Sequence, residues 1–499
     1  MFRDIQQIAK HKFDLLVVGG GINGAAIAYL AAENGLSVAL IDKGDFASGT
    51  SSKSTKLVHG GIRYLENFEF DLVAEALKER FIQFKNAPHL VKPIPFVIPV
   101  YDGDPRPLWM MKLGVLLYDK LAGNFKLGPH RWFSAKELLE QEPSLNPQGL
   151  KGGVLYYDAQ MDDARLCLEN VLMAAQKGVR TANYVEALSL MKENRKAVGV
   201  VAKDAITGHI FEIRAKRVVC ALGPWTSTVK FLKEDRAQAK NTVRTTKGIH
   251  ILYKGEITKR AVVIQTRNDR RIFFVVPWQG NSLIGTTDTD FNGNPDDVRS
   301  DEEDIRYLIN ETRRVFPSAA LDEQKIIITF AGLRPLVHAR GLPSKISRKH
   351  EIETTTSGVT YVMGGKYTTY RRIAEDCLKK FMYVKTRPPL EYPLYGSGEI
   401  IPKAADVAQS FGIEEKVVHY LFEKYGTRYV DVLNLAERDP ALKENLCDCS
   451  LAIKAQVVYA VKVEMAQTVE DVIARRLGLI YAPCSSERCR QYIQSCFKV

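Results

Sequence analysis

The sequence has no apolar run that approaches the length of a membrane-spanning helix, and its eight cysteines form no C-x-x-C pair. The first absence argues against an integral membrane protein. The pair Cys447-x-Cys449 has the wrong spacing for a zinc finger and lacks a matching pair, so we expect no metal site. The first residues also lack the apolar core of a signal peptide. We therefore expect a cytoplasmic protein with free thiols.

Length and charge set further bounds. A chain of 499 residues is too long for one hydrophobic core and predicts two or three domains. The net charge of +12 indicates an anionic partner, which could be a small substrate, a membrane surface or a nucleic acid. A surface excess of lysine is equally compatible with this charge. No basic tract or aromatic stacking platform supports nucleic-acid binding.

The stretch from residue 13 to residue 66 organises the chain. A buried-strand pattern leads into a glycine turn that fits G-x-G-x-x-G through Gly19, Gly21 and Gly24. A helix pattern and a second strand follow, and the strand ends at Asp42. These glycines allow a tight turn, close approach to a pyrophosphate and close packing of the helix on the strand. The acid about 20 residues on can accept a hydrogen bond from a ribose hydroxyl. This order predicts a dinucleotide site.

The residues after the fingerprint favour FAD over NAD. A polar run at 48–56 replaces the immediate crossover that usually follows the second strand of an NAD enzyme. His59, a glycine pair and Arg63 then stand close together, a combination that a plain linker does not need. We expect this loop to follow an extended FAD towards its flavin.

The strands of the nucleotide domain are spread along the chain. A strand enters a glycine turn at Gly223, and another reaches Gly364-Gly365 just before a helix pattern, whose free N–H groups could face reduced flavin. Inserted segments must then build a second domain. We expect an FAD-binding domain at 1–85, 150–240 and 355–385, a substrate domain at 86–149 and 241–354, and a helical domain at 395–499.

One short segment leaves two interpretations open. Residues 107–123, PLWMMKLGVLLYDKLAG, combine Trp, Met and Leu with Lys112 and Lys120. The segment is too short to span a bilayer but could lie on one. It also fits an ordinary buried helix.

The ordered motifs TSSKSTKLVHGGIRYLE, ALGPWT, KGIH, RIFFVVPW, IGTTD, AGLRPL and GGKYTTYRR resemble the FAD-dependent glycerol-3-phosphate dehydrogenase family, which belongs to the D-amino-acid-oxidase-like flavoproteins. The resemblance covers most of 13–376 and continues more weakly to the C-terminus. It implies an α/β fold with a discontinuous Rossmann-like FAD domain, a mixed-sheet substrate domain and a C-terminal all-helical domain. It also implies oxidation of sn-glycerol 3-phosphate to dihydroxyacetone phosphate, with electrons passed to quinone at a membrane. Some relatives pass them to oxygen and form peroxide.

The resemblance carries over to particular residues. A base must take the proton of the C2 hydroxyl while hydride leaves for flavin N5, and we slightly prefer His59 to His250, with Lys247 as a third candidate to polarise the hydroxyl. The substrate ligands are expected to be Arg63, Tyr64, Arg334, Arg348, Lys366 and Thr369, of which Arg334 and Lys366 also serve the chemistry. The FAD contacts are expected to come from Gly19, Gly20, Gly21, Ile22, Asn23, Gly24, Asp42, Lys43, Thr50, Ser51, Ser52, Lys56, Leu57, His59, Gly60, Gly61, Val185, Ala221, Gly223, Trp225, Gly332, Arg334, Gly365, Lys366, Tyr367 and Thr368.

Three functions from different classes follow. The first is a quinone-linked dehydrogenase bound peripherally to the inner face of the cytoplasmic membrane. The second is a soluble oxidase that reduces oxygen. The third is a non-catalytic or nucleic-acid-binding flavoprotein, prompted only by the basic charge, and we expect no nucleic acid as partner. A homodimer is possible.

Overall fold

The structure is a computed structural model of the whole chain. The residues that it describes are 1–229, 232, 235, 243–267, 269–319, 321–337, 349–384, 392–400, 402–482 and 487–497.

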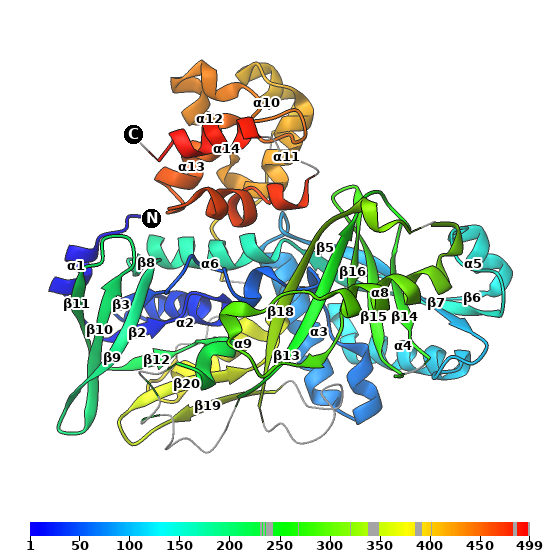
Figure 1. Ribbon diagram of the computed structural model, residues 1–499, viewed down its shortest axis with the longest axis horizontal. Coiled ribbons are helices and arrows are strands. Elements are labelled where there is room, and N and C mark those ends of the chain that lie inside the picture. Colours follow the sequence, from blue (N-terminus) through cyan, green and yellow to red (C-terminus); the bar gives the residue numbers. More distant parts are fainter. Residues whose placement is uncertain are drawn as a thin grey trace.

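A six-stranded sheet forms the centre of the nucleotide domain (Figure 1). Its order is β19-β20-β12-β2-β3-β8, with β19 antiparallel to β20 and the other neighbours parallel. The three strands β2, β3 and β12 are short, apolar and fully buried, because the sheet is covered on both faces. The bounds are β2 (Leu15–Val18), β3 (Val38–Ile41), β8 (Arg180–Ala182), β12 (Val218–Cys220), β19 (His350–Thr354) and β20 (Val359–Gly364).

Alternate residues of β2 belong to two different cores. Leu15 and Val17 pack with the helices of one face, whereas Leu16 and Val18 pack with a second, four-stranded sheet on the other. The helices are α2 (Ile22–Glu33), α6 (Asp163–Gln176) and α9 (Tyr370–Lys379), and the sheet has the order β1 (Lys12–Phe13), β11 (Ile210–Ala215), β10 (Lys196–Asp204), β9 (Val185–Glu193).

A ten-stranded sheet builds the substrate domain, with the order β17-β13-β16-β15-β14-β5-β7-β4 and with β18 and β6 paired beside β13 and β7. The two longest pairs in this sheet, β13 with β18 and β5 with β7, are antiparallel. The bounds are β4 (Leu57–Val58), β5 (Val91–Tyr101), β6 (Arg131–Ser134), β7 (Leu150–Met161), β13 (Val243–Tyr253), β14 (Ala261–Gln265), β15 (Ile272–Trp278), β16 (Asn281–Gly285), β17 (Thr289–Asp290) and β18 (Ile326–Val337).

The chain passes between these domains at points that differ from the expected boundaries. Strand β7 lies in the substrate sheet although we expected the nucleotide domain to resume at residue 150, and the chain returns to that domain at α6. Strand β4 also joins the substrate sheet. The remaining helices of these two domains are α1 (Ile5–Lys10), α3 (Phe70–Asn86), α4 (Leu108–Ala122), α5 (Ala135–Gln141) and α8 (Glu302–Val315).

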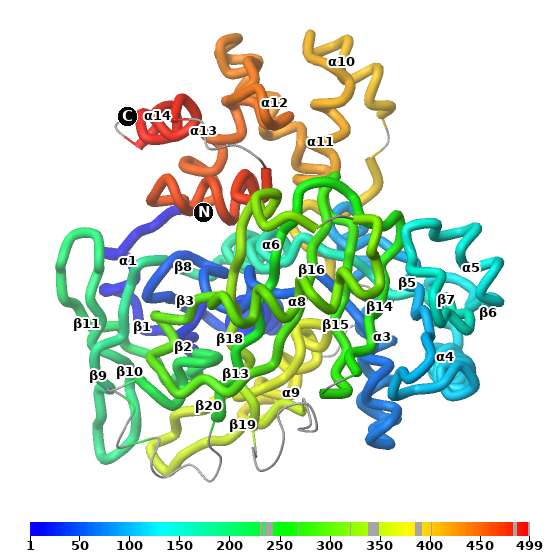
Figure 2. The backbone as a smooth tube through the Cα atoms, turned by 45° about the vertical axis from the view of Figure 1, so that its right-hand side comes forward, coloured from blue at the N-terminus to red at the C-terminus, as the bar shows by residue number. Residues whose placement is uncertain are grey.

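The C-terminal helices form a separate lobe over α6, as Figures 1 and 2 show from two directions. Charged groups join the lobe to the body: Arg165 pairs with Glu464 at 2.6 Å, and the N-terminal amine donates to the Val463 carbonyl at 2.6 Å. The helices are α10 (Ala404–Phe411), α11 (Glu415–Tyr425), α12 (Tyr429–Arg438), α13 (Lys454–Lys462) and α14 (Glu487–Ser495), with a π-helix at Asp471–Arg476. This arrangement confirms the predicted fold class.

The structure bears on two further expectations, the absence of a membrane-spanning helix and the presence of free thiols. Among the described residues, no helix combines the length and the apolar character needed to cross a bilayer. The expectation of free thiols is wrong for Cys449, which is disulfide-bonded. Cys167, Cys220 and Cys377 are buried thiols, and Cys484 lies outside the described residues.

Candidate active site

A cavity of about 1210 Å³ runs along the C-terminal ends of β2 and β3. The turn from β2 into α2 forms its floor, and Gly19 adopts a left-handed φ of +107° there. A Cβ atom at Gly24 would lie 1.8 Å from the Gly19 carbonyl oxygen, so only glycine permits this packing. The start of α2 therefore lies against the cavity, where its positive dipole end would favour a bound phosphate. This cradle fits the pyrophosphate of FAD.

Asp42 closes the cavity where a ribose is expected. Its carboxylate accepts from the Gly20 amide at 2.6 Å and from the Gly44 amide at 2.8 Å. Burial nevertheless raises the pKa of Asp42 to about 6, because these two amides only partly offset the loss of water. A hydroxyl donor such as a ribose would stabilise the charged form and lower this pKa.

Lys43 and Trp225, both predicted as FAD contacts, line the same end of the cavity. Lys43 pairs with Asp296 at 2.7 Å, its ammonium lies 4.8 Å from the Trp225 ring centre, and the Trp225 indole donates to Asp296 at 2.9 Å. Asp296 was not predicted from the sequence, because it lies 71 residues after Trp225 and no local motif connects the two. Of the predicted FAD contacts, this cavity is lined by Gly19, Gly21, Ile22, Asn23, Asp42, Lys43, Thr50, Ser51, Val185, Ala221, Gly223, Trp225, Gly365, Lys366 and Tyr367.

A second cavity of about 710 Å³ opens between the nucleotide domain and the ten-stranded sheet. It shares Thr50, Lys53, Gly365, Lys366 and Tyr367 with the first cavity. A flavin ring that extends from the first cavity would therefore reach the second at these residues. Apart from these shared residues, the predicted residues that line the second cavity are Leu57, His59, Gly61, Arg63, Tyr64, His250, Gly332, Arg334 and Thr368.

His250 is held from two sides in the wall of this second cavity. The Thr55 hydroxyl lies 2.8 Å from its Nε2, and the Phe330 ring stacks on it with centres 4.9 Å apart. The side chain is 2% exposed, and burial, with the charges of Arg334 and Lys56, lowers the pKa of His250 well below its usual range. The imidazole is therefore neutral and can accept a proton.

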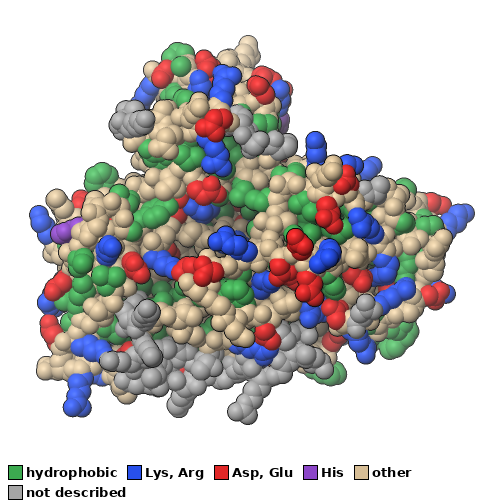
Figure 3. Space-filling model, viewed as in Figure 1, with side chains coloured by type: hydrophobic (Ala, Val, Ile, Leu, Met, Phe, Trp, Pro, Cys, Tyr) green, Lys and Arg blue, Asp and Glu red, His purple; other side chains and the backbone are tan. Residues whose placement is uncertain are grey.

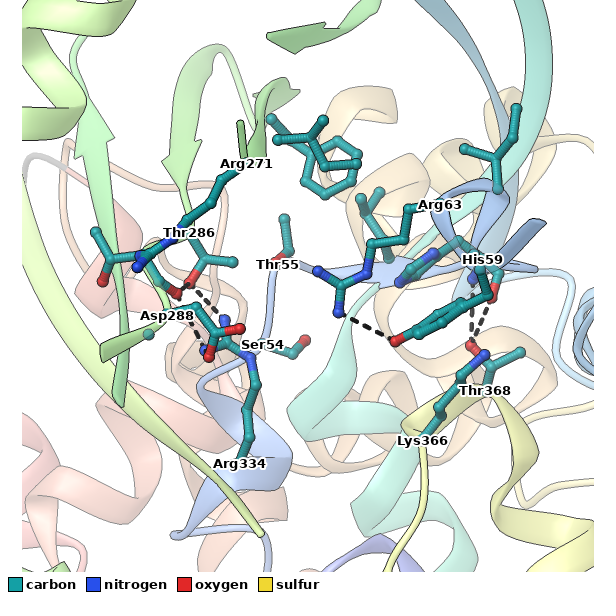
Figure 4. Close-up of a pocket in the computed structure, with 18 of the residues that line it drawn as sticks. Ser54, Thr55, His59, Arg63, Arg271, Thr286, Asp288, Arg334, Lys366 and Thr368 are labelled. Carbon is teal, nitrogen blue, oxygen red and sulfur yellow. Dashed lines mark hydrogen bonds and ion pairs between the residues drawn. The ribbon is translucent and has the colours of Figure 1, made fainter. Parts of the chain in front are cut away.

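His59 lines the same cavity on the side of Lys366 (Figure 4). Its backbone exchanges two hydrogen bonds with the Thr368 side chain, both at 3.2 Å, and its ring meets Phe274 edge-on with centres 6.3 Å apart. The segment with His59 and the segment with Thr368, both expected at the flavin, are thus hydrogen-bonded to each other. Both histidines reach the cavity.

Several cations surround the cavity. Arg334 donates to the Thr286 hydroxyl at 2.7 Å and pairs with Asp288 at 3.3 Å, and Arg63 donates to the Tyr64 hydroxyl at 3.1 Å (Figure 4). The Lys366 ammonium lies 3.9 Å from the centre of the Tyr64 ring. Such a concentration of positive charge suits a doubly charged anion.

Arg271 also lines this cavity, opposite Arg63 in Figure 4. It was not predicted, and neither were Thr55, Asp288 and Lys53, which line the cavity as well. Arg271 is the first residue of the quoted RIFFVVPW motif and stands directly before β15. This motif could therefore have led to the prediction of Arg271 as a site residue. Thr55 belongs to the polar run at 48–56, where no spacing rule distinguishes it from its neighbours.

Some predicted residues do not reach either cavity. Lys247 points away and binds Asp301 and Asp304 of the α8 region, the latter at 2.7 Å. Lys56 is buried and pairs with Asp163 at 2.5 Å. The others that line neither cavity are Gly20, Gly24, Ser52, Gly60 and Thr369, and Arg348 lies outside the described residues.

The fold and the two joined cavities define an FAD-dependent oxidoreductase of the D-amino-acid-oxidase-like class. The profile of the family described as FAD dependent oxidoreductase matches residues 14–371, and that of the C-terminal domain of alpha-glycerophosphate oxidase matches residues 390–497.

Full-length relatives identify the family more closely. The chain is 38% identical to a glycerol-3-phosphate dehydrogenase of Synechocystis sp., over 96% of this chain and 90% of that protein. It is 36% identical to the aerobic glycerol-3-phosphate dehydrogenase of Staphylococcus aureus, over 95% and 88%. The structure of the Bacillus halodurans glycerol-3-phosphate dehydrogenase with FAD superposes with a TM-score of 0.81 at 30% identity, over 99% and 92%. The chain belongs to the FAD-dependent glycerol-3-phosphate dehydrogenase family.

Proposed function

We propose that the protein oxidises sn-glycerol 3-phosphate to dihydroxyacetone phosphate and passes the electrons to a membrane quinone. The observation that carries the proposal is the second cavity. A neutral His250 and several cationic side chains, among them Arg334 and Lys366, line this cavity beside the place that a flavin would reach. FAD, when bound, supplies the acceptor for the hydride that leaves C2. This supports the same reaction as the one named for the relatives above.

The cations are proposed to bind the phosphate and orient the carbon that reacts. Arg63, Arg271 and Arg334 offer planar forks that suit phosphate oxygens. Arg334 already shares its charge with Asp288, which fixes the direction of its guanidinium. Lys366, at the junction of the two cavities, is proposed to stabilise negative charge beside the flavin.

His250 is proposed as the base that takes the proton of the C2 hydroxyl. From the motifs we slightly preferred His59, but the surroundings of His250 favour His250: its ring is neutral, and Thr55 and Phe330 fix its orientation. A base must be deprotonated at the working pH, and burial meets this condition for His250. His59 is then proposed to line the flavin side of the cavity.

The test is anaerobic mixing of the purified yellow protein with sn-glycerol 3-phosphate. We expect rapid bleaching of the flavin absorbance, and its return on addition of a quinone. If the flavin stays oxidised at saturating substrate, the proposed function is wrong. If bleaching occurs and only oxygen restores the colour, with peroxide as the product, the oxidase alternative is correct.

A membrane contact is proposed at the outer face of α4. Trp109, Leu113 and Leu116 are exposed there, at 68%, 58% and 46%, with spacings that place them on one side of the helix. Phe68, 79% exposed, lies in the neighbouring turn. Met110 of the same helix lines the second cavity, so this apolar face adjoins the mouth of the proposed active site. The segment at 107–123 thus fits the membrane-surface interpretation better than a fully buried helix.

Quinone-containing vesicles of mixed neutral and anionic lipids test this contact. Leu113→Glu is expected to weaken vesicle binding at least tenfold, because it removes apolar area and adds a charge that anionic lipid repels. Turnover with vesicle-borne quinone should fall in parallel, whereas turnover with a soluble dye should persist. Ile206→Glu is the matched control, since Ile206 is 50% exposed but lies in a turn before β11. Equal binding by both variants and the unmodified protein would contradict the contact.

A further inference from the structure

Tyr481, from the C-terminal lobe, lies directly behind the proposed active site. Its hydroxyl accepts from the Lys56 ammonium at 3.0 Å and donates to the Ser52 carbonyl at 3.4 Å. Its ring meets Phe330 with centres 6.1 Å apart and lies 4.8 Å from the Lys56 ammonium. A residue more than 400 positions away in the sequence therefore holds both ends of the loop at 52–56.

One buried carboxylate also fixes the loop at 52–56. Asp163, at the start of α6, binds the Lys56 ammonium at 2.5 Å and accepts from the Ser54 hydroxyl at 2.7 Å and amide at 3.1 Å. Lys56 also donates to the Ser52 carbonyl at 2.9 Å and has a left-handed φ of +60°. A lysine buried in this way needs every one of its acceptors, because an unsatisfied charge is costly in the interior.

The loop and the Phe330 ring both hold His250. Thr55, in the middle of the loop, reaches Nε2 of His250 at 2.8 Å, and Phe330 stacks on the imidazole. Tyr481 touches Phe330 with its ring and the loop with its hydroxyl. Both supports of the histidine thus rest on the same side chain of the C-terminal lobe.

The lobe is anchored so that Tyr481 can act as a fixed support. Arg476 and Arg475 both bind the fully buried carboxylate of Asp45, at 2.8 and 2.6 Å. Asp45 follows Asp42 by three residues, in the turn that closes the FAD cavity. Charge-assisted bonds of this kind in a dry interface are directional and hold the partners in one arrangement.

We propose that Tyr481 is a positioning residue for His250, so that the C-terminal lobe sets the rate of proton removal without touching the substrate. This inference rests on the proposed function and adds a role for a domain whose described residues line neither cavity. The hydroxyl keeps the loop at 52–56 in the geometry that Thr55 needs, and the ring supports Phe330. Small displacements of a base matter because proton transfer requires hydrogen-bond distance.

The experiment compares Tyr481→Phe and Tyr481→Ala with the unmodified holoenzyme in single-turnover flavin reduction by sn-glycerol 3-phosphate. Tyr481→Phe keeps the ring and removes one acceptor from Lys56, so we expect about a fivefold slower reduction. Tyr481→Ala removes both supports, and the expected loss is about fiftyfold. The FAD content and the substrate concentration for half-maximal rate should stay within about twofold, because Tyr481 itself lines neither cavity.

Tyr420→Phe is the matched control. Tyr420 belongs to α11 of the same lobe, and its hydroxyl donates to the Leu477 carbonyl at 3.2 Å, away from the loop. This variant should reduce its flavin at the unmodified rate. Unchanged rates in both Tyr481 variants, or losses that follow FAD content or substrate affinity instead of the reduction step, would overturn the proposal. A failure of the proposed function is a separate result, since the unmodified enzyme would then show no bleaching.

Discussion

Replacement of His250 by alanine is expected to slow the reduction of bound flavin by sn-glycerol 3-phosphate about 10²- to 10⁴-fold. The variant loses the group proposed to take the C2 hydroxyl proton, while the cations that bind the phosphate remain. Its substrate affinity should therefore change much less than its rate. Stopped-flow absorbance of the flavin under anaerobic conditions measures both quantities.

The companion variant His59→Ala distinguishes the two candidates. His59 lines the cavity, so a loss of up to about tenfold is expected from altered packing beside Phe274. If His59→Ala loses more rate than His250→Ala, the assignment of the base is reversed.

The pH profile gives an independent check on the base. Burial lowers the pKa of His250, so the imidazole protonates only when the pH falls below the value of about 6.5 for an exposed histidine. The reduction rate of the unmodified enzyme should therefore show no loss from His250 protonation between pH 8 and pH 6.5. It should fall on further acidification through the lowered pKa.

The nucleotide half of the site could be predicted because its constraints are local. Gly19, Gly21 and Asp42 occur within 24 residues of one strand–helix–strand unit, and each has a steric or hydrogen-bonding reason for its place. The start of α6 is also set locally, because the Asp162 carboxylate accepts from the Arg165 amide there.

The substrate half was predicted less completely because it is assembled across long distances. We expected Lys247 in the site together with His250. Both residues belong to one strand, β13, and stand three positions apart. Successive side chains of a strand point to opposite faces, so His250 and Lys247 face different sides. His250 lines the cavity, and Lys247 binds the carboxylates of the α8 region. The alternation of side chains along a strand, applied to this motif, would have assigned Lys247 and His250 to opposite faces of the sheet.

Lys56 and Tyr481 illustrate what no local pattern contains. Lys56 stands in a motif that was expected at the cofactor, but its ammonium turns inward to Asp163, which is 107 residues further on. Tyr481 comes from a domain to which the sequence assigned no chemistry. Only the packing of the C-terminal lobe on the loop at 52–56 brings these groups together.

Replacement of Gly24 by alanine is expected to lower the FAD content of the purified protein to less than about a tenth of the normal value. The added Cβ would lie 1.8 Å from the Gly19 carbonyl oxygen, which is backbone and has no rotamer to adopt. The start of α2 must therefore move away from β2, and the amides that face the pyrophosphate move with it. The same displacement overpacks the core between α2 and the six-stranded sheet, which costs about 1–3 kcal/mol of the free energy of unfolding.

The ratio of flavin to protein absorbance measures the FAD content, and a thermal unfolding curve with added FAD separates lost binding from lost folding. Gly114→Ala is the matched control, because a Cβ there meets no atom within 4 Å and Gly114 lies within the helix α4. In a helix, alanine is favoured over glycine, so this variant should keep its FAD and unfold at an equal or slightly higher temperature. Full FAD content in Gly24→Ala would mean that α2 can shift without loss of the cofactor. The close packing of the helix on Gly19 would then not determine the shape of the cradle.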